Sequence, residues 1–148
     1  MSVSKVLIID DNALYGRVLK EGFNKYNIES LVIDDLADPV QMAVEFQPDF
    51  VILDIMMPNK TGFDICQQIK TDPRTLHIPI IFVSANEDAD SVITSMHFGC
   101  IDYIKKPVDV EDLVKALITH NFHMPLKECF SSFRETINNL KDKYNAHA

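Results

Sequence analysis

The sequence predicts a doubly wound α/β domain, in which five β–α units build one parallel sheet between two layers of helices. Five short apolar runs recur along residues 1–120, and segments with helical periodicity separate them. The runs are nearly continuous in Val, Ile, Leu and Phe, which is typical of strands that are buried on both faces. The length of 148 residues and the 47% hydrophobic content allow one such domain with a real core, plus an appendage.

Each of the five predicted strands is an apolar run that ends in a polar or charged residue. They are residues 5–10 (KVLIID), 29–34 (ESLVID), 49–54 (DFVILD), 79–84 (PIIFVS) and 100–105 (CIDYIK).

Amphipathic segments follow these runs and predict the helices. Residues 12–26 place apolar side chains on adjoining helical faces: Leu14, Val18 and Gly22 on one, with Leu19, Phe23 and Tyr26 beside it. The second helix follows the acidic, proline-bearing segment 34–39, where we expect Asp34, Asp35 and Asp38 to act as caps.

The third helix has a stripe of Phe63, Cys66 and Ile69 and ends at Asp72-Pro73. The fourth runs from the acidic segment 86–90 to Phe98, with Gly99 just past its end. The fifth begins within residues 108–118.

Residues 121–148 differ from the rest of the chain. They carry a net charge of +1, which leaves −9 on residues 1–120. Apolar residues at helical spacing predict one amphipathic helix there. We therefore expect a domain at 1–120 and a helical extension at 121–148. Two interpretations of the extension stay open: it packs on the domain as a sixth helix, or it links or dimerises the protein.

Composition excludes several classes of protein. A net charge of −8 argues against direct nucleic-acid binding, which needs a basic face. No apolar run approaches the length of a membrane span, and the first one is too short for a signal peptide. The three cysteines lack the spacing of a metal site, so buried, reduced thiols are expected. A cytoplasmic location follows as an expectation.

The residues that close the apolar runs can form one site. The C-terminal ends of parallel strands share one edge of a sheet, and ligands bind there at the point where the strand order reverses. With the order 2-1-3-4-5, that point lies between the first and third strands. The site would combine three carboxylates, a hydroxyl and an amine, from Asp10, Asp11, Asp54, Ser84 and Lys106.

Three neighbouring carboxylates repel one another unless a cation compensates their charge. Carboxylate and carbonyl oxygens suit Mg²⁺, which keeps several of its waters in protein sites. A hydroxyl and a lysine suit a phosphoryl oxygen. The set of groups fits phosphoryl transfer with an aspartate as the nucleophile.

Four motifs then resemble one family, the receiver domain of two-component response regulators. They are DD at 10–11, DIMMPNKTGFD from 54, SA at 84–85 and YIKKP from 103. The resemblance covers residues 1 to about 120. It implies a flavodoxin-like (βα)5 three-layer sandwich of the CheY-like superfamily, with sheet order 2-1-3-4-5.

The resemblance also implies the roles of the acidic residues. Asp54 would accept a phosphoryl group from a phosphohistidine and become an aspartyl phosphate. Asp11, Asp54 and the backbone carbonyl of Met56 would bind Mg²⁺, while Asp10 would assist through water. In this family the protein catalyses only its own phosphorylation and dephosphorylation, and is not an enzyme in the usual sense.

Four further residues have implied roles on the neighbouring strands. Ser84 would hydrogen-bond the phosphoryl group, and Lys106 would pair with it. Pro107 fits a cis Lys-Pro peptide bond. Tyr103 would be a switch that turns inward when Ser84 is drawn to the phosphate, although an ordinary core or surface aromatic residue is the alternative. The surface near strands four and five would change with the switch.

The implied partners are a sensor histidine kinase or a histidine phosphotransfer protein, and a downstream protein or an output domain. A homodimer is possible, whereas direct contacts with nucleic acid or a membrane are not expected. The alternative function is a fragment of a longer regulator that mainly dimerises or docks. A Mg²⁺-dependent phosphatase is the least favoured, because DIM lacks the second acid of a DxD motif.

Overall fold

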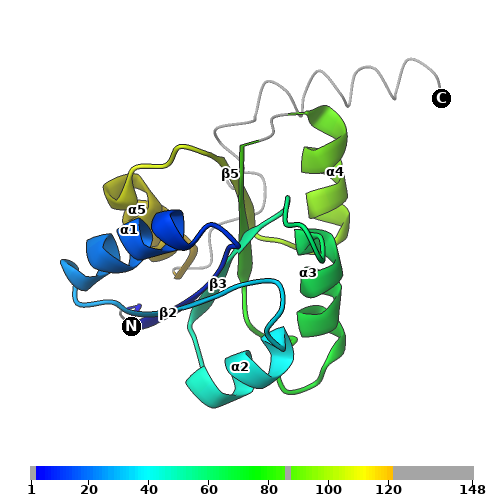
Figure 1. The fold of residues 1–148 in the computed structure, drawn as a ribbon, viewed down its shortest axis with the longest axis horizontal. Coiled ribbons are helices and arrows are strands. Elements are labelled where there is room, and N and C mark those ends of the chain that lie inside the picture. Colours follow the sequence, from blue (N-terminus) through cyan, green and yellow to red (C-terminus); the bar gives the residue numbers. More distant parts are fainter. Residues whose placement is uncertain (1–2, 86–87, 122–148) are drawn as a thin grey trace.

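The computed structural model describes residues 3–85 and 88–121 of the chain. Strands and helices alternate throughout this part (Figure 1), so the five predicted β–α units are confirmed. Residues 122–148, which hold the predicted amphipathic helix, lie outside the described residues. The elements are β1 (Lys5–Ile9), α1 (Ala13–Asn24), β2 (Glu29–Ile33), α2 (Pro39–Phe46), β3 (Phe50–Asp54), α3 (Gly62–Thr71), β4 (Ile80–Ser84), α4 (Ala89–His97), β5 (Asp102–Lys105) and α5 (Val110–Asn121).

The strands form one parallel sheet in the order β2-β1-β3-β4-β5, as the sequence predicts. β1 pairs with both β2 and β3, so the strand order reverses at β1. In the register between β3 and β4, Asp54 lies opposite Val83. The C-terminal ends of β1, β3 and β4 therefore meet at one edge of the sheet.

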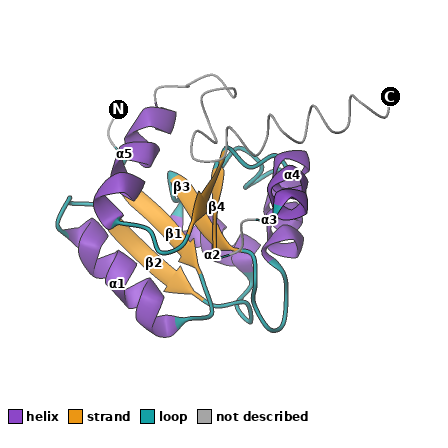
Figure 2. Ribbon diagram, turned by 90° about the horizontal axis from the view of Figure 1, so that it is seen from above, coloured by secondary structure: helices purple, strands orange, loops and turns teal. Residues whose placement is uncertain are grey.

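Alternate residues of each strand enter two separate hydrophobic cores. In β1, Val6 and Ile8 belong to the core that α1 and α5 cover, whereas Leu7 and Ile9 belong to the core beneath α2, α3 and α4. Figure 2 shows α1 and α5 on one side of the sheet, with α3 and α4 on the other. All four of these β1 side chains are fully buried. Burial on both faces explains why the strands read as continuous apolar runs.

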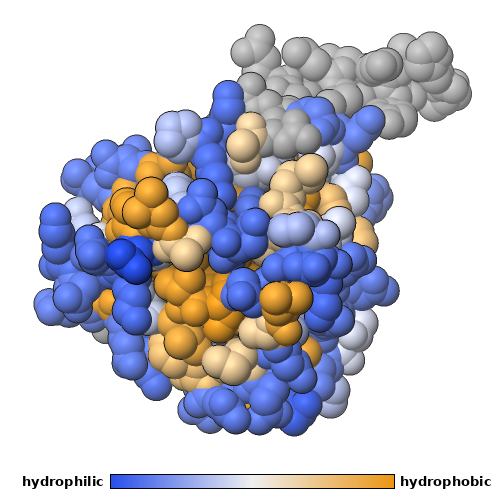
Figure 3. Space-filling view, in the orientation of Figure 1, coloured by the Kyte–Doolittle hydropathy of each residue, from blue (hydrophilic) through white to orange (hydrophobic). Residues whose placement is uncertain are grey.

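Only one of the two adjoining apolar faces of α1 is buried. Leu14 and Val18 are 69% and 52% exposed, whereas Gly16, Leu19 and Phe23 face the sheet. The cause is a close approach to β2, since a Cβ on Gly16 would lie 2.6 Å from Val32 Cγ1. The helix therefore turns its smallest residue towards the sheet and leaves Leu14 outside. Figure 3 shows apolar surface in the region where α1 and α5 lie.

The ends of the helices largely follow the sequence signals. Asp38 caps α2, and its side chain accepts hydrogen bonds from Val40 N–H and Gln41 N–H. Gly99 follows α4 with φ of +81°, the left-handed conformation that favours glycine. Within the described ranges, no helix has both the length and the apolarity needed to cross a bilayer.

Two of the three cysteines lie in the described part of the chain. Cys66 and Cys100 are both buried, as expected, and Cys129 lies outside the described residues. Burial raises the pKa of Cys66 to about 11, against a smaller opposite effect of Lys70.

Candidate functional site

Three carboxylates converge at the edge of the sheet where the strand order reverses. Asp10 and Asp11 follow β1, and Asp54 is the last residue of β3. One carboxylate oxygen from each of the three lies within 4.8 Å of the others. Asp10 and Asp54 are buried, at 4% and 7% exposure, while Asp11 is exposed. The predicted acidic cluster is therefore assembled, with an open side at Asp11.

Lys106 reaches into this cluster from the loop that follows β5. Its ammonium lies 2.7 Å from Asp10 Oδ2 and 3.6 Å from Asp54 Oδ2. The backbone N–H of Lys106 donates to the carbonyl oxygen of Ser84, which ties this loop to the end of β4. The Lys106-Pro107 peptide bond is cis, as the resemblance implies.

The electrostatics of the cluster centre on Asp54. Burial raises the pKa of Asp54 to about 6; Lys106 opposes this shift, and the negative charge of Asp10 adds to it. Burial acts to lower the pKa of Lys106. The hydrogen bond from Lys106 to Asp10 and the negative charge of Asp54 outweigh burial, so the pKa of Lys106 is raised. One ammonium thus compensates the three carboxylates only in part.

This arrangement fits a divalent cation. The converging atoms are hard carboxylate oxygens, and the exposed Asp11 leaves room for the waters that Mg²⁺ retains. In the described ranges, Lys106 is the only cation with an ion pair to the cluster, so negative charge remains to be balanced. The Met56 side chain is 67% exposed, and the role of its carbonyl as a ligand stays a prediction.

Ser84 and Tyr103 lie beside the cluster on β4 and β5. Ser84 is the last residue of β4, Tyr103 lies in β5, and both are fully buried. Burial raises the pKa of Tyr103, and a hydrogen bond with the Ser84 side chain opposes the shift. The phenol therefore points inward in this structure, whereas its role as a switch stays a prediction.

Two contacts of the site were not foreseen from the sequence. The first is the ion pair between Lys106 and Asp10, because the sequence predicted only that Lys106 would pair with a phosphoryl group. The second involves Asp35, which was expected to cap α2. Asp35 is instead buried, and its Oδ2 accepts hydrogen bonds from Asn59 N–H at 2.6 Å and Lys60 N–H at 3.3 Å.

The expectation that Asp35 caps α2 was wrong because Asp35, which follows β2, hydrogen-bonds the loop that follows a different strand, β3. Asp38 caps α2 as expected, whereas Asp34 does not cap it and accepts hydrogen bonds within its own turn. Asp35 reaches Asn59, 24 residues along the chain. Its partners lie in the loop between Asp54 and α3. No local sequence signal could have found this contact, since it depends on how α2 and α3 pack against one another.

We expect Asp35→Ala to lower the melting temperature by roughly 5 °C at pH 7, because two backbone N–H groups lose their acceptor. Burial acts to raise the pKa of Asp35, but the hydrogen bonds from Asn59 and Lys60 outweigh it and lower the pKa below 3.8. The stabilisation is therefore complete above pH 3.8 and disappears as the pH falls through the lowered value. Thermal melts of both proteins between acid and neutral pH measure this difference.

Asp34→Ala is the matched control. Its exposed carboxylate also accepts two backbone hydrogen bonds, but from residues only two and three positions away. We expect a smaller loss at this position. Equal melting temperatures for wild type and Asp35→Ala at pH 7 would contradict the role of the long-range contact.

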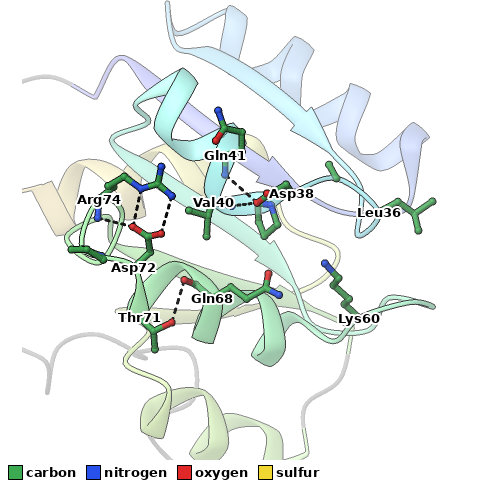
Figure 4. Close-up of a pocket in the computed structure, with 12 residues that line it drawn as sticks. Leu36, Asp38, Val40, Gln41, Lys60, Gln68, Thr71, Asp72 and Arg74 are labelled. Atoms are coloured by element: carbon green, nitrogen blue, oxygen red, sulfur yellow. Dashed lines mark hydrogen bonds and ion pairs between the residues drawn. The ribbon is translucent and has the colours of Figure 1, made fainter.

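A separate groove lies between the start of α2 and the end of α3 (Figure 4). Its charged side chains are largely engaged with each other or with the backbone. Asp38 caps α2, and the guanidinium of Arg74 forms two hydrogen bonds with Asp72. The groove does not gather reactive groups as the acidic cluster does, so the cluster remains the candidate site.

Comparison with known proteins agrees with this geometry. Residues 6–118 match the family model described as the response regulator receiver domain. PilH of Pseudomonas aeruginosa is 31% identical over 115 residues, which cover 78% of this chain and 95% of PilH. The DNA-binding dual master transcriptional regulator RpaA of Synechocystis is 32% identical over 126 residues. That match covers 82% of this chain and 52% of RpaA, so the chain spans about half of this relative.

A solved structure agrees with the sequence relatives. The response regulator receiver domain protein from Clostridium thermocellum is 28% identical and superposes with a TM-score of 0.71. The match covers 82% of this chain and all of the other. The family model alone spans well over half of the chain and coincides with the β–α body that carries the acidic cluster. The chain therefore belongs to the response regulator receiver domain family.

Proposed function

We propose that this protein is the phosphoacceptor switch of a two-component system, and that Asp54 takes a phosphoryl group from a phosphohistidine in a Mg²⁺-dependent reaction. One observation carries the proposal. Oxygens of Asp10, Asp11 and Asp54 lie within 4.8 Å of one another, and the Lys106 ammonium lies 3.6 Å from Asp54. A carboxylate that could act as the nucleophile, oxygens that could bind a hard cation and a fixed positive charge thus lie together, which supports the proposal.

The reaction would proceed by displacement at phosphorus. An oxygen of Asp54 forms the new P–O bond while the P–N bond of the donor breaks, and the electron pair stays on the imidazole nitrogen. Mg²⁺ held by Asp11, Asp54 and the Met56 carbonyl, with Asp10 assisting through water, would supply positive charge to the phosphoryl oxygens. Lys106 would pair with the transferred group, and Ser84 would donate a hydrogen bond to it.

The electrostatics favour this role for Asp54. Its pKa of about 6 leaves the carboxylate mostly ionised at neutral pH, so it can act as a nucleophile. Transfer of the phosphoryl group onto Asp54 would draw Lys106 from Asp10 towards the new charge. Movement of Ser84 in the same direction would alter its hydrogen bond with Tyr103, and with it the surface of β4 and β5.

Partners and location are parts of the same proposal. The donor would be a sensor histidine kinase or a histidine phosphotransfer protein in the cytoplasm. Leu14, Val18 and Met56 are exposed apolar residues that lie close in sequence to the acidic residues, which suits a protein donor. RpaA is named as DNA-binding, and this chain covers about half of it. We therefore propose that the signal is passed on through a further domain, a partner protein or a homodimer, and that residues 1–120 do not contact DNA directly.

A phosphodonor experiment tests the function. We expect acetyl phosphate to add one phosphoryl group to the purified protein, measured by intact mass, only when Mg²⁺ is present. Asp11→Asn should raise the Mg²⁺ concentration needed for half-maximal labelling by about tenfold or more, because even the loss of an outer partner of a metal ligand lowers metal affinity by that much. Titration of the labelling rate against Mg²⁺ gives this difference.

Asp34→Asn is the control for charge alone. Asp34 also follows a strand of the sheet, but it is exposed and hydrogen-bonds within its own turn. Its variant should label like wild type. Labelling that proceeds equally well in EDTA would contradict the proposed function, and so would an Asp11→Asn variant with an unchanged Mg²⁺ requirement.

A further inference from the structure

The ammonium of Lys106 has a third neighbour besides its two carboxylates. It lies 4.3 Å from the centroid of the Tyr15 ring, over the face of that ring. The side chain of Lys106 is only 18% exposed. Asp10 at 2.7 Å, Asp54 at 3.6 Å and the aromatic face thus surround the charge on three sides. A cation in this position is attracted by the negative face of the ring.

The position of Tyr15 is set by the start of α1. Asn12 caps this helix, and its side chain accepts the backbone N–H of Tyr15 at 3.1 Å. The backbone N–H of Asn12 in turn donates to Asp10 Oδ1 at 2.9 Å. One capping residue therefore links the backbone of Tyr15 to the carboxylate that pairs with Lys106.

The far end of the ring is enclosed by the loop that carries Lys106. The Tyr15 hydroxyl is buried and faces the backbone N–H of Val108, although the two do not reach the geometry of a hydrogen bond. Removing the hydroxyl would therefore break no formed hydrogen bond. Removing the ring would open the ammonium to water and to other side-chain conformations.

We propose that Tyr15 is a positioning residue, whose ring holds the Lys106 ammonium between Asp10 and Asp54 for phosphoryl transfer. The inference rests on the proposed function and adds a residue that none of the four sequence motifs contains. An ammonium that is already in position does not have to move when negative charge develops on the phosphoryl oxygens, so no reorganisation energy is added to the barrier. The Tyr15 hydroxyl has no hydrogen-bond partner among the described residues, so Tyr15 would act through Lys106.

Two substitutions separate the ring from the hydroxyl. We expect Tyr15→Leu to slow labelling by acetyl phosphate at saturating Mg²⁺ by about three- to tenfold, the range of a partly buried cation–π contact. Tyr15→Phe keeps the ring and should stay within about twofold of wild type. The apparent affinity for Mg²⁺ should be the same in all three proteins. Tyr26→Leu, at a 45% exposed position just after α1, is the matched control and should label normally.

A double-mutant cycle shows whether Tyr15 acts through Lys106. Tyr15→Leu should have no further effect on labelling when it is added to Lys106→Ala, because the charge that it positions is gone. A purely structural role of the ring would slow both backgrounds alike. Thermal melts confirm that each variant is folded at the temperature of the assay.

A second readout needs no phosphodonor. The methylene protons next to the Lys106 ammonium should be shifted upfield in the NMR spectrum of wild type and Tyr15→Phe by the ring above them. They should return to ordinary values in Tyr15→Leu. Their ordinary position in wild type would contradict the contact itself.

The outcomes distinguish this inference from the function on which it rests. A wild-type protein that takes no phosphoryl group overturns both. Normal labelling of wild type together with an unaffected Tyr15→Leu overturns the inference alone. The inference also fails if Tyr15→Leu slows labelling equally with and without Lys106, or if Tyr15→Phe is as slow as Tyr15→Leu.

Discussion

Asp54→Asn is expected to reduce labelling by acetyl phosphate at least about a hundredfold, to the background of the assay, because an amide oxygen cannot replace the carboxylate nucleophile. Asparagine keeps the size and shape of the side chain at the end of β3, so the fold should be retained. Intact mass after incubation with Mg²⁺ and the donor measures the loss. Digestion of labelled wild-type protein should place the phosphoryl group on the peptide that contains Asp54.

Stability separates a chemical effect of Asp54→Asn from a folding defect. The pKa of Asp54 is raised to about 6, so ionised Asp54 lowers the stability of the folded state progressively above pH 3.8 and most fully above pH 6. Asparagine removes that cost. The variant should therefore melt at a higher temperature than wild type at pH 7.5 in metal-free buffer. Undiminished labelling of this variant would show that another residue is the acceptor.

Gly62→Ala is expected to destabilise the protein by about 3 kcal/mol and to lower its melting temperature by about 10 °C. Gly62 opens α3 and its N–H donates to the carbonyl of Ile55 at 2.8 Å. An added Cβ would collide with the carbonyl oxygen of Asp54 and lie 2.8 Å from Ile55 Cα. Both neighbours are backbone and cannot rotate away. The start of α3 must then move off the strand end that presents Asp54, so labelling should slow as well.

Gly99→Ala is the control for a general effect of replacing glycine. Its φ of +81° strains an alanine, but a Cβ there meets nothing within 4 Å. We expect a cost of about 1 kcal/mol and no change in labelling. Denaturant melts of the two variants give the comparison. A Gly62→Ala protein as stable as Gly99→Ala would mean that the contact with Asp54 relaxes easily.

The sequence was a good guide wherever the determining interactions are local. Strands such as 50–54 are apolar on both faces, and this pattern is retained however the sheet is assembled. Parallel strands also bring their C-terminal ends to one edge, so the carboxylates of Asp10 and Asp54 could be placed near each other without coordinates. The cap of α2 at Asp38 is local in the same way.

Prediction failed where two segments far apart in the chain decide the outcome. The apolar pattern of α1 did not say which of its faces is buried, and the approach of Gly16 to Val32 decides that. Asp35 looks like a capping residue in sequence, yet it binds the loop at residues 59–60. Tyr15 reads as one more aromatic residue of a helix, and only its place above Lys106 gives it a role.

The sequence by itself determined the order of the elements, the polar residues that end the strands and the family, because spacing and side-chain chemistry are properties of the chain. The tertiary structure decided which charges meet. The pairing of Lys106 with Asp10 joins residues 96 positions apart, and the raised pKa of Asp54 depends on burial by the whole domain. Coulomb forces and desolvation act over a few ångströms of space, and that proximity exists only once the sheet has formed.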